Sequence, residues 1–174
     1  AHITVHGVVQ GVGFRPFIYR LAGQHALTGY VANTVAGVVI EVEGGGQAVA
    51  DFVEEITSQP PPLAHIETLQ VRKSPLEGSG RYRSFTIEES TAGDADAVVL
   101  PPDLDVCPDC LDELFDPADR RSRYPFINCT NCGPRYTLIE DLPYDRPLTA
   151  MKGFALCPRC AAEYKDPNDR RFHA

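Results

Sequence analysis

The six cysteines of this 174-residue chain all lie in its second half and form three C-x-x-C pairs. Such a pair directs two thiolates at one point. At this density the pattern is typical of metal coordination, whereas disulfide scaffolds are usually smaller and secreted. The sequence therefore predicts a metal-binding module after residue 106, with a disulfide framework as the less favoured alternative. The pairs are Cys107/Cys110, Cys129/Cys132 and Cys157/Cys160.

The cysteine-rich half contains an internal repeat. The string "CPDCLDELFDPADRR" from Cys107 returns as "CPRCAAEYKDPNDRR" from Cys157, fifty residues later. In the first copy, eighteen residues separate Cys110 from Cys129, which is typical of a four-cysteine, zinc-ribbon-like site. Because four thiolates close the coordination sphere, we expect this Zn²⁺ to be structural. Its predicted ligands are Cys107, Cys110, Cys129 and Cys132.

The second copy supplies only Cys157 and Cys160 before the sequence ends at Ala174. If the same spacing is repeated, the next pair falls beyond Ala174. We therefore expect a truncated second copy within a polypeptide that continues. The alternative is that His173 or other groups complete a second metal site.

Four arginines lie close to the first cysteine cluster in the sequence. We expect them to offset the negative charge of the thiolates, although a solvated face is an equally good interpretation. They are Arg120, Arg121, Arg123 and Arg135.

The first half has the element order β-α-β-β-α-β. Alternating apolar residues predict strands, and apolar residues at helical spacing predict helices. This order indicates an α+β, ferredoxin-like fold, an antiparallel sheet with two helices on one face. The expected strands are Ile3–Val9, Leu27–Asn33, Val38–Val42, Ile66–Val71 and an edge strand at Phe85–Ile87, and the expected helices contain Phe14–Leu21 and Val49–Ile56.

The acidic, proline-bearing stretch before the first cysteine pair marks a linker between two modules. We therefore divide the chain into a first domain over residues 1–90, a linker over 91–106, and a zinc-finger module over 107–174.

A glycine-rich turn joins the first predicted strand to the first predicted helix, and an arginine follows it. Glycines allow successive backbone N–H groups to turn toward one point ahead of a helix N-terminus, which favours an anion. The guanidinium adds paired donors suited to phosphoryl oxygens. The predicted phosphate-binding residues are Gln10, Gly11, Val12, Gly13, Phe14 and Arg15.

The strings "GVVQGVGFR" (7–15) and "GYVANTVAGVVIEVEG" (29–44) resemble the acylphosphatase family over about ninety residues. The resemblance implies that Arg15 holds the phosphate, that Asn33 positions the attacking water, and that the reaction is hydrolysis of an acyl phosphate. Neither catalytic residue needs to gain or lose a proton, so catalysis would come from charge stabilisation and placement.

The acylphosphatase-like half, the repeat and "FINCTNCGPRYT" (126–137) together resemble the N-terminal part of the HypF family, carbamoyltransferases of [NiFe]-hydrogenase maturation. That resemblance implies carbamoyl phosphate as substrate and a contribution to cyanide-ligand synthesis. It also implies that ATP use and carbamoyl transfer to a cysteine of a partner, HypE, need C-terminal domains absent here.

Charge and hydropathy weigh against two other classes. The net charge is −8, and residues 91–174 carry 15 acidic against 10 basic residues. This balance argues against a zinc-ribbon nucleic-acid-binding protein. With no long apolar run and no signal-like start, we expect a cytoplasmic protein with no membrane partner. The remaining alternatives are a general acylphosphatase with a structural zinc appendage and a scaffold with an inert pocket.

Overall fold

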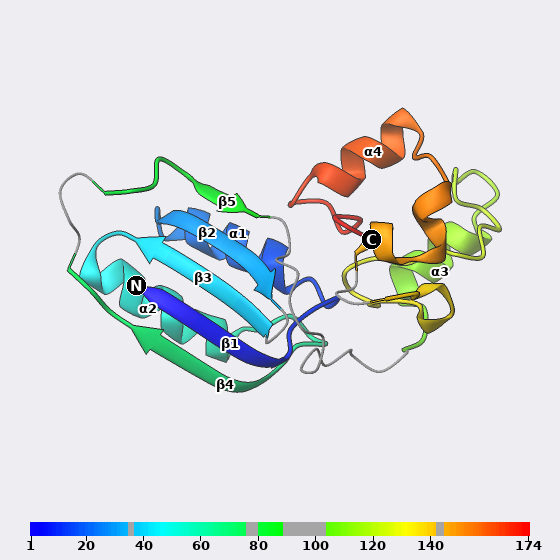
Figure 1. The fold of residues 1–174 in the computed structure, drawn as a ribbon. Helices are drawn as coiled ribbons and strands as arrows, with labels where there is room; N and C mark the ends of the chain where they lie inside the picture. The colour runs from blue at the N-terminus through cyan, green and yellow to red at the C-terminus, as the bar shows by residue number, and fades with distance from the viewer. Residues whose placement is uncertain (35–36, 76–79, 89–103, 142–144) are drawn as a thin grey trace.

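The computed structural model describes residues 1–34, 37–75, 80–88, 104–141 and 145–174, and the linker predicted at 91–106 lies largely outside them. The first half is one five-stranded sheet in the order β4-β1-β3-β2-β5, with two helices (Figure 1). Its elements are β1 (His2–Val8), α1 (Phe14–Gln24), β2 (Thr28–Thr34), β3 (Gly37–Glu43), α2 (Gly46–Ser58), β4 (His65–Arg72) and β5 (Phe85–Ile87).

The predicted element order is confirmed, but the sheet is mixed rather than antiparallel throughout. The pairs β1–β3, β1–β4 and β2–β3 are antiparallel, whereas β5 runs parallel to β2. Strands β2 and β4 run in opposite directions. Because β5 lies at the opposite edge of the sheet from β4 and runs in the opposite direction to it, β5 is parallel to β2.

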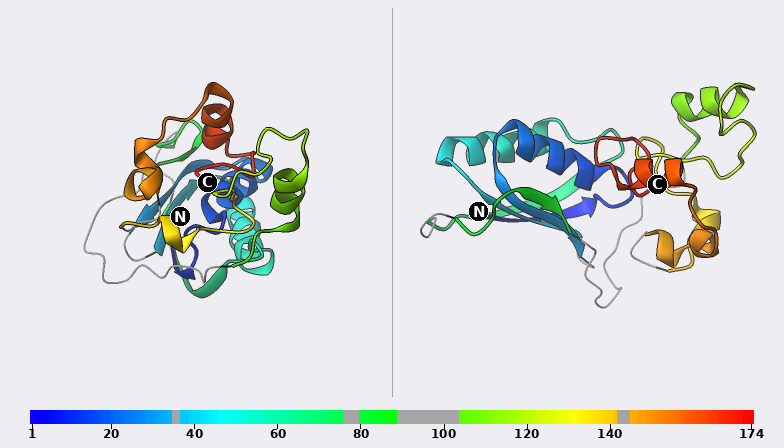
Figure 2. Two further views of the ribbon diagram at one scale, coloured as in Figure 1. Left: turned by 90° about the vertical axis from the view of Figure 1, so that its right-hand side faces the viewer. Right: turned by 90° about the horizontal axis from the view of Figure 1, so that it is seen from above.

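Both helices cover one face of the sheet, and the core lies between the helices and the sheet (Figure 2). Along β1, Ile3 and Val5 are fully buried, as a period of two requires. Ile18 on α1 and Phe52 on α2 meet them from the other layer, also fully buried. This core holds the strand-to-helix turn after β1 in a fixed position.

The second half contains little regular structure. Its described residues form two helices of eight residues and three short 3₁₀ segments, and a small separate core forms around the first cysteine pairs. A segment with so few buried apolar side chains needs a cross-link such as a metal. The elements are α3 (Pro108–Phe115), η1 (Tyr136–Leu138), η2 (Arg146–Leu148), η3 (Ala150–Gly153) and α4 (Pro158–Lys165).

The second half, which we call the finger half, packs beside the turn between β1 and α1 (Figures 1 and 2). Arg20 on α1 donates a hydrogen bond from Nη1 to the Pro167 carbonyl at 3.1 Å. A Cβ on Gly13 would lie 3.0 Å from Thr130 Cβ. The finger half therefore lies directly over the predicted phosphate-binding turn. In the described part of the chain, no helix is long and apolar enough to cross a membrane.

Candidate functional site

The predicted phosphate-binding turn has the backbone geometry of an anion cradle. Gly11 and Gly13 both adopt left-handed conformations, with φ of 72° and 75°. Gly13 is the N-cap of α1 and has no side chain with which to cap it. The first N–H groups of the helix are thus left for a ligand, and the helix dipole favours a negative one.

Arg15 and Asn33 lie together beside this turn. Both are buried, with 8% and 2% of their surface exposed. In the amide orientation that satisfies both groups, the Asn33 side-chain oxygen accepts hydrogen bonds from Arg15 Nε at 3.1 Å and Nη2 at 3.2 Å. Strand β2 and helix α1 therefore bring together the two residues for which the acylphosphatase resemblance implies catalytic roles.

The Gln10 side chain links the turn to two neighbouring strands. Its Nε2 atom donates hydrogen bonds to the carbonyl oxygens of Thr34, at 2.7 Å, and Gly37, at 3.0 Å. The Gln10 side chain thus fastens the turn to the strands β2 and β3. Any contribution of Gln10 to phosphate binding must come from its backbone.

The finger half places the Asp145 carboxylate beside Arg15. Asp145 Oδ1 lies 3.2 Å from Arg15 Nη2 and 3.7 Å from His173 Nδ1. Sequence reasoning missed both contacts. Asp145 follows Arg15 by 130 residues, and no motif or spacing links the two positions.

The cradle opens into a small hollow of about 40 Å³ between the two halves. A ligand held there would touch both halves of the chain. A larger hollow, of about 280 Å³, lies within the finger half and shares Asn128, His173 and Ala174 with the first. The finger half lines the small hollow with Asn128, Cys129, Thr130, Gly133, Phe172, His173 and Ala174.

His173 is held by stacking. Its ring lies parallel to Tyr164, with centroids 4.8 Å apart, and also stacks on Phe172 at 4.2 Å. Burial, and then the negative charge of Asp145, raise the pKa of Tyr164, which stays neutral at pH 7. His173 is therefore placed beside the cradle, between the hollow and an aromatic stack.

Four cysteines converge in the finger half: Cys107, Cys110, Cys129 and Cys132. Their Sγ atoms all lie within 4.8 Å of one another, and three of the separations are 3.6, 3.8 and 3.9 Å. Four sulfurs about 2.3 Å from a tetrahedral Zn²⁺ are about 3.8 Å apart. The thiols present therefore fit a zinc ion.

Neighbouring donors ease the negative charge of this cluster. The Asn131 backbone N–H donates to Cys129 Sγ at 3.3 Å, and Arg135 Nη2 donates to Cys132 Sγ at 3.2 Å. The hydrogen bond from Cys129 lowers the pKa of the Cys132 thiol, and the Arg135 charge lowers it further. The hydrogen bond to Cys132, in contrast, raises the pKa of the Cys129 thiol. The Asn131 and Arg135 contacts favour the thiolate form that a metal requires.

Cys157 and Cys160 stand apart from that cluster. Cys157 is exposed, and its Sγ accepts a hydrogen bond from the Cys160 backbone N–H at 3.5 Å. Among the described residues, only the first four cysteines form a group of three or more metal-ligating side chains. His173 does not complete a second site in this conformation.

The arginines near the cluster in sequence are distributed differently in space. Arg135 contacts the first cluster, whereas Arg120 donates from Nη1 to Cys160 Sγ at 3.1 Å. Arg121 binds Glu163, on the helix of the second copy. Arg123 adopts a left-handed backbone, with φ of 60°, and its N–H bonds the Leu114 carbonyl. The remaining arginine contacts of the first cluster come from beyond residue 169.

Each half of the chain matches a known protein family. The acylphosphatase family model matches residues 1–87, and the model of the HypF finger matches residues 106–139 and 156–174. An acylphosphatase from Thermotoga petrophila is 40% identical over 87 residues, covering 49% of this chain and 92% of that protein.

Longer relatives match nearly the whole chain. The carbamoyltransferase HypF of Synechocystis sp. is 53% identical over 152 residues, covering 87% of this chain and 19% of that protein. A crystal structure of full-length HypF in the phosphate- and nucleotide-bound form superposes with a TM-score of 0.86 at 50% identity, covering 99% of this chain and 22% of that one. The chain thus spans about a fifth of the length of these relatives. Through residues 1–87 it belongs to the acylphosphatase family, and its second half carries the finger of the HypF carbamoyltransferases.

Proposed function

We propose that the chain binds and hydrolyses carbamoyl phosphate in the hollow between its two halves. The observation that carries this proposal is the buried Arg15 guanidinium, held by Asn33 beside the N-terminus of α1. Arg15 and the backbone N–H groups of the turn grip the phosphoryl group, and Asn33 positions water. Addition of water across the anhydride gives carbamate and inorganic phosphate.

Catalysis in this proposal is electrostatic. Neither Asn33 nor Arg15 needs to gain or lose a proton in the reaction. The fixed guanidinium and the backbone dipoles stabilise charge that grows on the phosphoryl oxygens as the anhydride bond breaks. The small hollow favours a small acyl group, which is consistent with a carbamoyl substituent.

The Asp145 carboxylate contacts the Arg15 guanidinium through Nη2. A phosphoryl oxygen seeks the same donors as a carboxylate oxygen. In the proposed cycle the phosphoryl group therefore takes the place of Asp145 on Arg15 Nη2, and the carboxylate moves aside. This contact makes phosphate affinity depend on the finger half.

We propose that this activity is one part of a larger reaction. The longer relatives bear the name carbamoyltransferase, and one solved relative is described as phosphate- and nucleotide-bound. We propose that this chain is the N-terminal part of such an enzyme of [NiFe]-hydrogenase maturation. Use of ATP and transfer to HypE would then belong to the rest of that enzyme.

The four-cysteine cluster has a structural role in this proposal. A Zn²⁺ held by Cys107, Cys110, Cys129 and Cys132 cross-links the finger half, whose own apolar core is small. Cys157 and Cys160 would need further ligands from a longer polypeptide to hold a second ion.

Phosphate release from carbamoyl phosphate and from acetyl phosphate tests the proposal. We expect the chain to prefer carbamoyl phosphate, and Asn33→Ala to slow its hydrolysis about 100-fold. Equal turnover of both substrates would favour a general acylphosphatase, and no turnover of either would favour an inert scaffold.

A further inference from the structure

The two copies of the repeat adopt the same local structure. Helices α3 and α4 have the same length, and each begins directly after a cysteine with nearly the same backbone angles, φ −66° with ψ 158° for Cys107 and φ −66° with ψ 161° for Cys157. A glutamate lies at the same place in both helices, and a D-P-x-D-R-R segment follows each. The copies can therefore be compared position by position.

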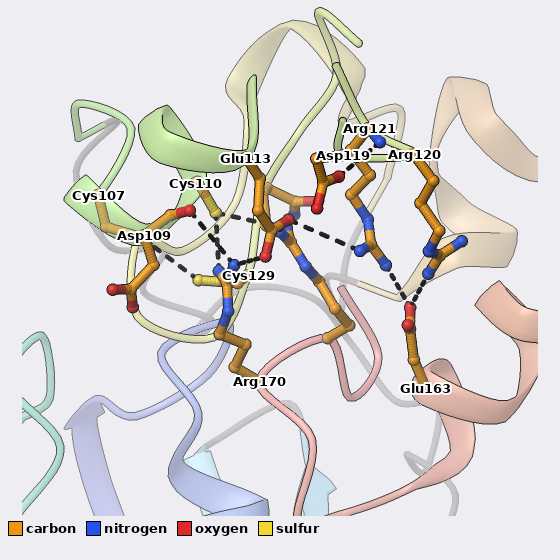
Figure 3. Close-up of polar contacts among 12 residues, drawn as sticks. Cys107, Asp109, Cys110, Glu113, Asp119, Arg120, Arg121, Cys129, Glu163 and Arg170 are labelled. Atoms are coloured by element: carbon orange, nitrogen blue, oxygen red, sulfur yellow. Dashed lines mark hydrogen bonds and ion pairs between the residues drawn. The ribbon is translucent and has the colours of Figure 1, made fainter. Parts of the chain in front are cut away.

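The arginine pair that follows the second helix reaches the first copy (Figure 3). Arg170 Nη1 donates to Cys110 Sγ at 3.1 Å, and Arg171 Nη1 donates to the same sulfur at 3.4 Å. Both guanidinium groups also bind the Glu113 carboxylate on α3. A predicted zinc ligand thus receives two hydrogen bonds from a segment sixty residues away.

The arginine pair that follows the first helix makes the reciprocal contacts (Figure 3). Arg120 and Arg121 bind the Glu163 carboxylate on α4, and Arg120 Nη1 donates to Cys160 Sγ at 3.1 Å. Arg121 also lies 3.6 Å from Glu113, so it bridges the two glutamates. The arginine pair of each copy therefore contacts the other copy and donates hydrogen bonds to a cysteine there.

Charge explains why these contacts matter to a metal. Four thiolates around a Zn²⁺ leave an excess of negative charge, and guanidinium N–H groups hydrogen-bonded to sulfur reduce it. Arg171 is buried, with 7% of its surface exposed, so its charge is poorly screened by water. Glu113 anchors both guanidinium groups and fixes their direction toward Cys110.

We propose that Arg170 and Arg171 are positioning residues of the first zinc site, so that the second copy of the repeat sets the metal affinity of the first. The inference is independent of acyl phosphate hydrolysis. It predicts that the first site weakens when the second copy loses its arginines, although all four ligands remain.

Zinc competition with a chromogenic chelator tests this in the full chain. All variants carry Cys157→Ser, so that the ion measured is the one held by the four clustered cysteines. We expect Arg170→Gln to weaken zinc binding about tenfold or more. The matched control is Arg120→Gln, the same change at the equivalent position, which contacts Cys160 and should alter the affinity less than about twofold. Equal effects of the two variants, or none from Arg170→Gln, would overturn the proposal.

Cobalt substitution separates a direct effect on the sulfurs from a general loss of stability. Removing a hydrogen bond to Cys110 raises the energy of its sulfur lone pairs. The thiolate-to-Co²⁺ charge-transfer band should therefore move to longer wavelength in Arg170→Gln and stay in place in Arg120→Gln. Arg170→Lys, which keeps the charge and leaves the fold least disturbed, should bind zinc with an affinity between wild type and Arg170→Gln. A band unmoved in both Arg170 variants would overturn the proposal.

Discussion

Arg15 Nη2 lies 3.2 Å from Asp145 Oδ1, and the contact joins the phosphate-binding turn to the finger half. The Arg15 side chain is 9% exposed and the Asp145 side chain 20%, so the pair is largely shielded from water. A carboxylate in this position competes with phosphate for the same donors. The finger half is therefore part of the candidate active site as well as its neighbour.

Asp145→Asn should strengthen phosphate binding. The amide keeps the shape of the carboxylate but removes the charge that repels a phosphoryl group, and we expect inorganic phosphate to inhibit about three- to tenfold more strongly. The inhibition constant of phosphate in the hydrolysis assay measures this. Asp112→Asn, an exposed carboxylate on α3, serves as the control. Weaker inhibition in Asp145→Asn would mean that the carboxylate orients Arg15 for phosphate instead of competing with it.

Removal of zinc should unfold the finger half and spare the sheet. The two halves have separate cores, one of which is built around the cysteines. After treatment with a chelator and a reductant, we expect limited proteolysis to degrade residues 104–174 while the first half keeps its own thermal unfolding transition. Loss of both halves in one transition would contradict this division.

Gly29→Ala should destabilise the sheet strongly. Gly29 has a φ of 141°, and a Cβ there would lie 1.9 Å from the Glu41 carbonyl oxygen on the paired strand. We expect a loss of about 2 kcal/mol or more in the free energy of unfolding. Gly23→Ala on α1 is the matched control: a Cβ there meets no described atom within 4 Å apart from its chain neighbours and the backbone of its own helix, and the change should stabilise by about 0.5 kcal/mol. Urea denaturation of both variants checks the contrast.

A contact at the sheet end distant from the finger half predicts a loss of stability in alkali. The Tyr82 hydroxyl donates to Glu41, which lowers the pKa of the Glu41 carboxyl. Burial, with the hydrogen bond and charge of Glu41, raises the pKa of Tyr82 to about 12 from its ordinary value of 10.0. The raised pKa means that the Tyr82 contribution to stability is complete below pH 10.0 and is lost as the pH approaches 12. The contribution of Glu41 is lost only at the acid end, as the pH falls below 4.5, its ordinary pKa.

The urea midpoint measured from pH 8 to pH 11.5 tests this sign. Wild type should lose stability more steeply above pH 10 than Tyr82→Phe, which has no hydroxyl to ionise. Tyr136→Phe, an exposed residue of the finger half, should follow wild type. Parallel curves for wild type and Tyr82→Phe would refute the assignment.

The sequence predicted those parts of the molecule that local patterns determine. The alternation of Ile3 and Val5 located β1, and the glycines before Arg15 located the turn, because each pattern reflects contacts within a few residues. The two C-x-x-C pairs and their eighteen-residue separation located the first cluster, because that spacing is typical of a four-cysteine zinc site. The prediction of an entirely antiparallel sheet was wrong because nothing local to Phe85 records which strand it joins or in which direction.

The contacts between distant segments were not predictable in this way. Asp145 reaches Arg15, and Arg170 reaches Cys110, only because the two halves and the two repeat copies dock together. The repeat itself held a signal for the second contact. Identical D-P-x-D-R-R segments after each helix suggest equivalent roles, but not that the arginines are exchanged between copies.

The central claim is that Arg15 binds the phosphoryl end of the substrate, and equilibrium binding of inorganic phosphate tests it without depending on turnover. Isothermal titration of the zinc-loaded chain should detect one phosphate site in wild type. The control Arg20→Ala, which changes an arginine on the same helix that contacts Pro167, should keep this site. Arg15→Ala should lose it, with affinity reduced about 100-fold or more. Equal phosphate affinity in wild type and Arg15→Ala would contradict the account.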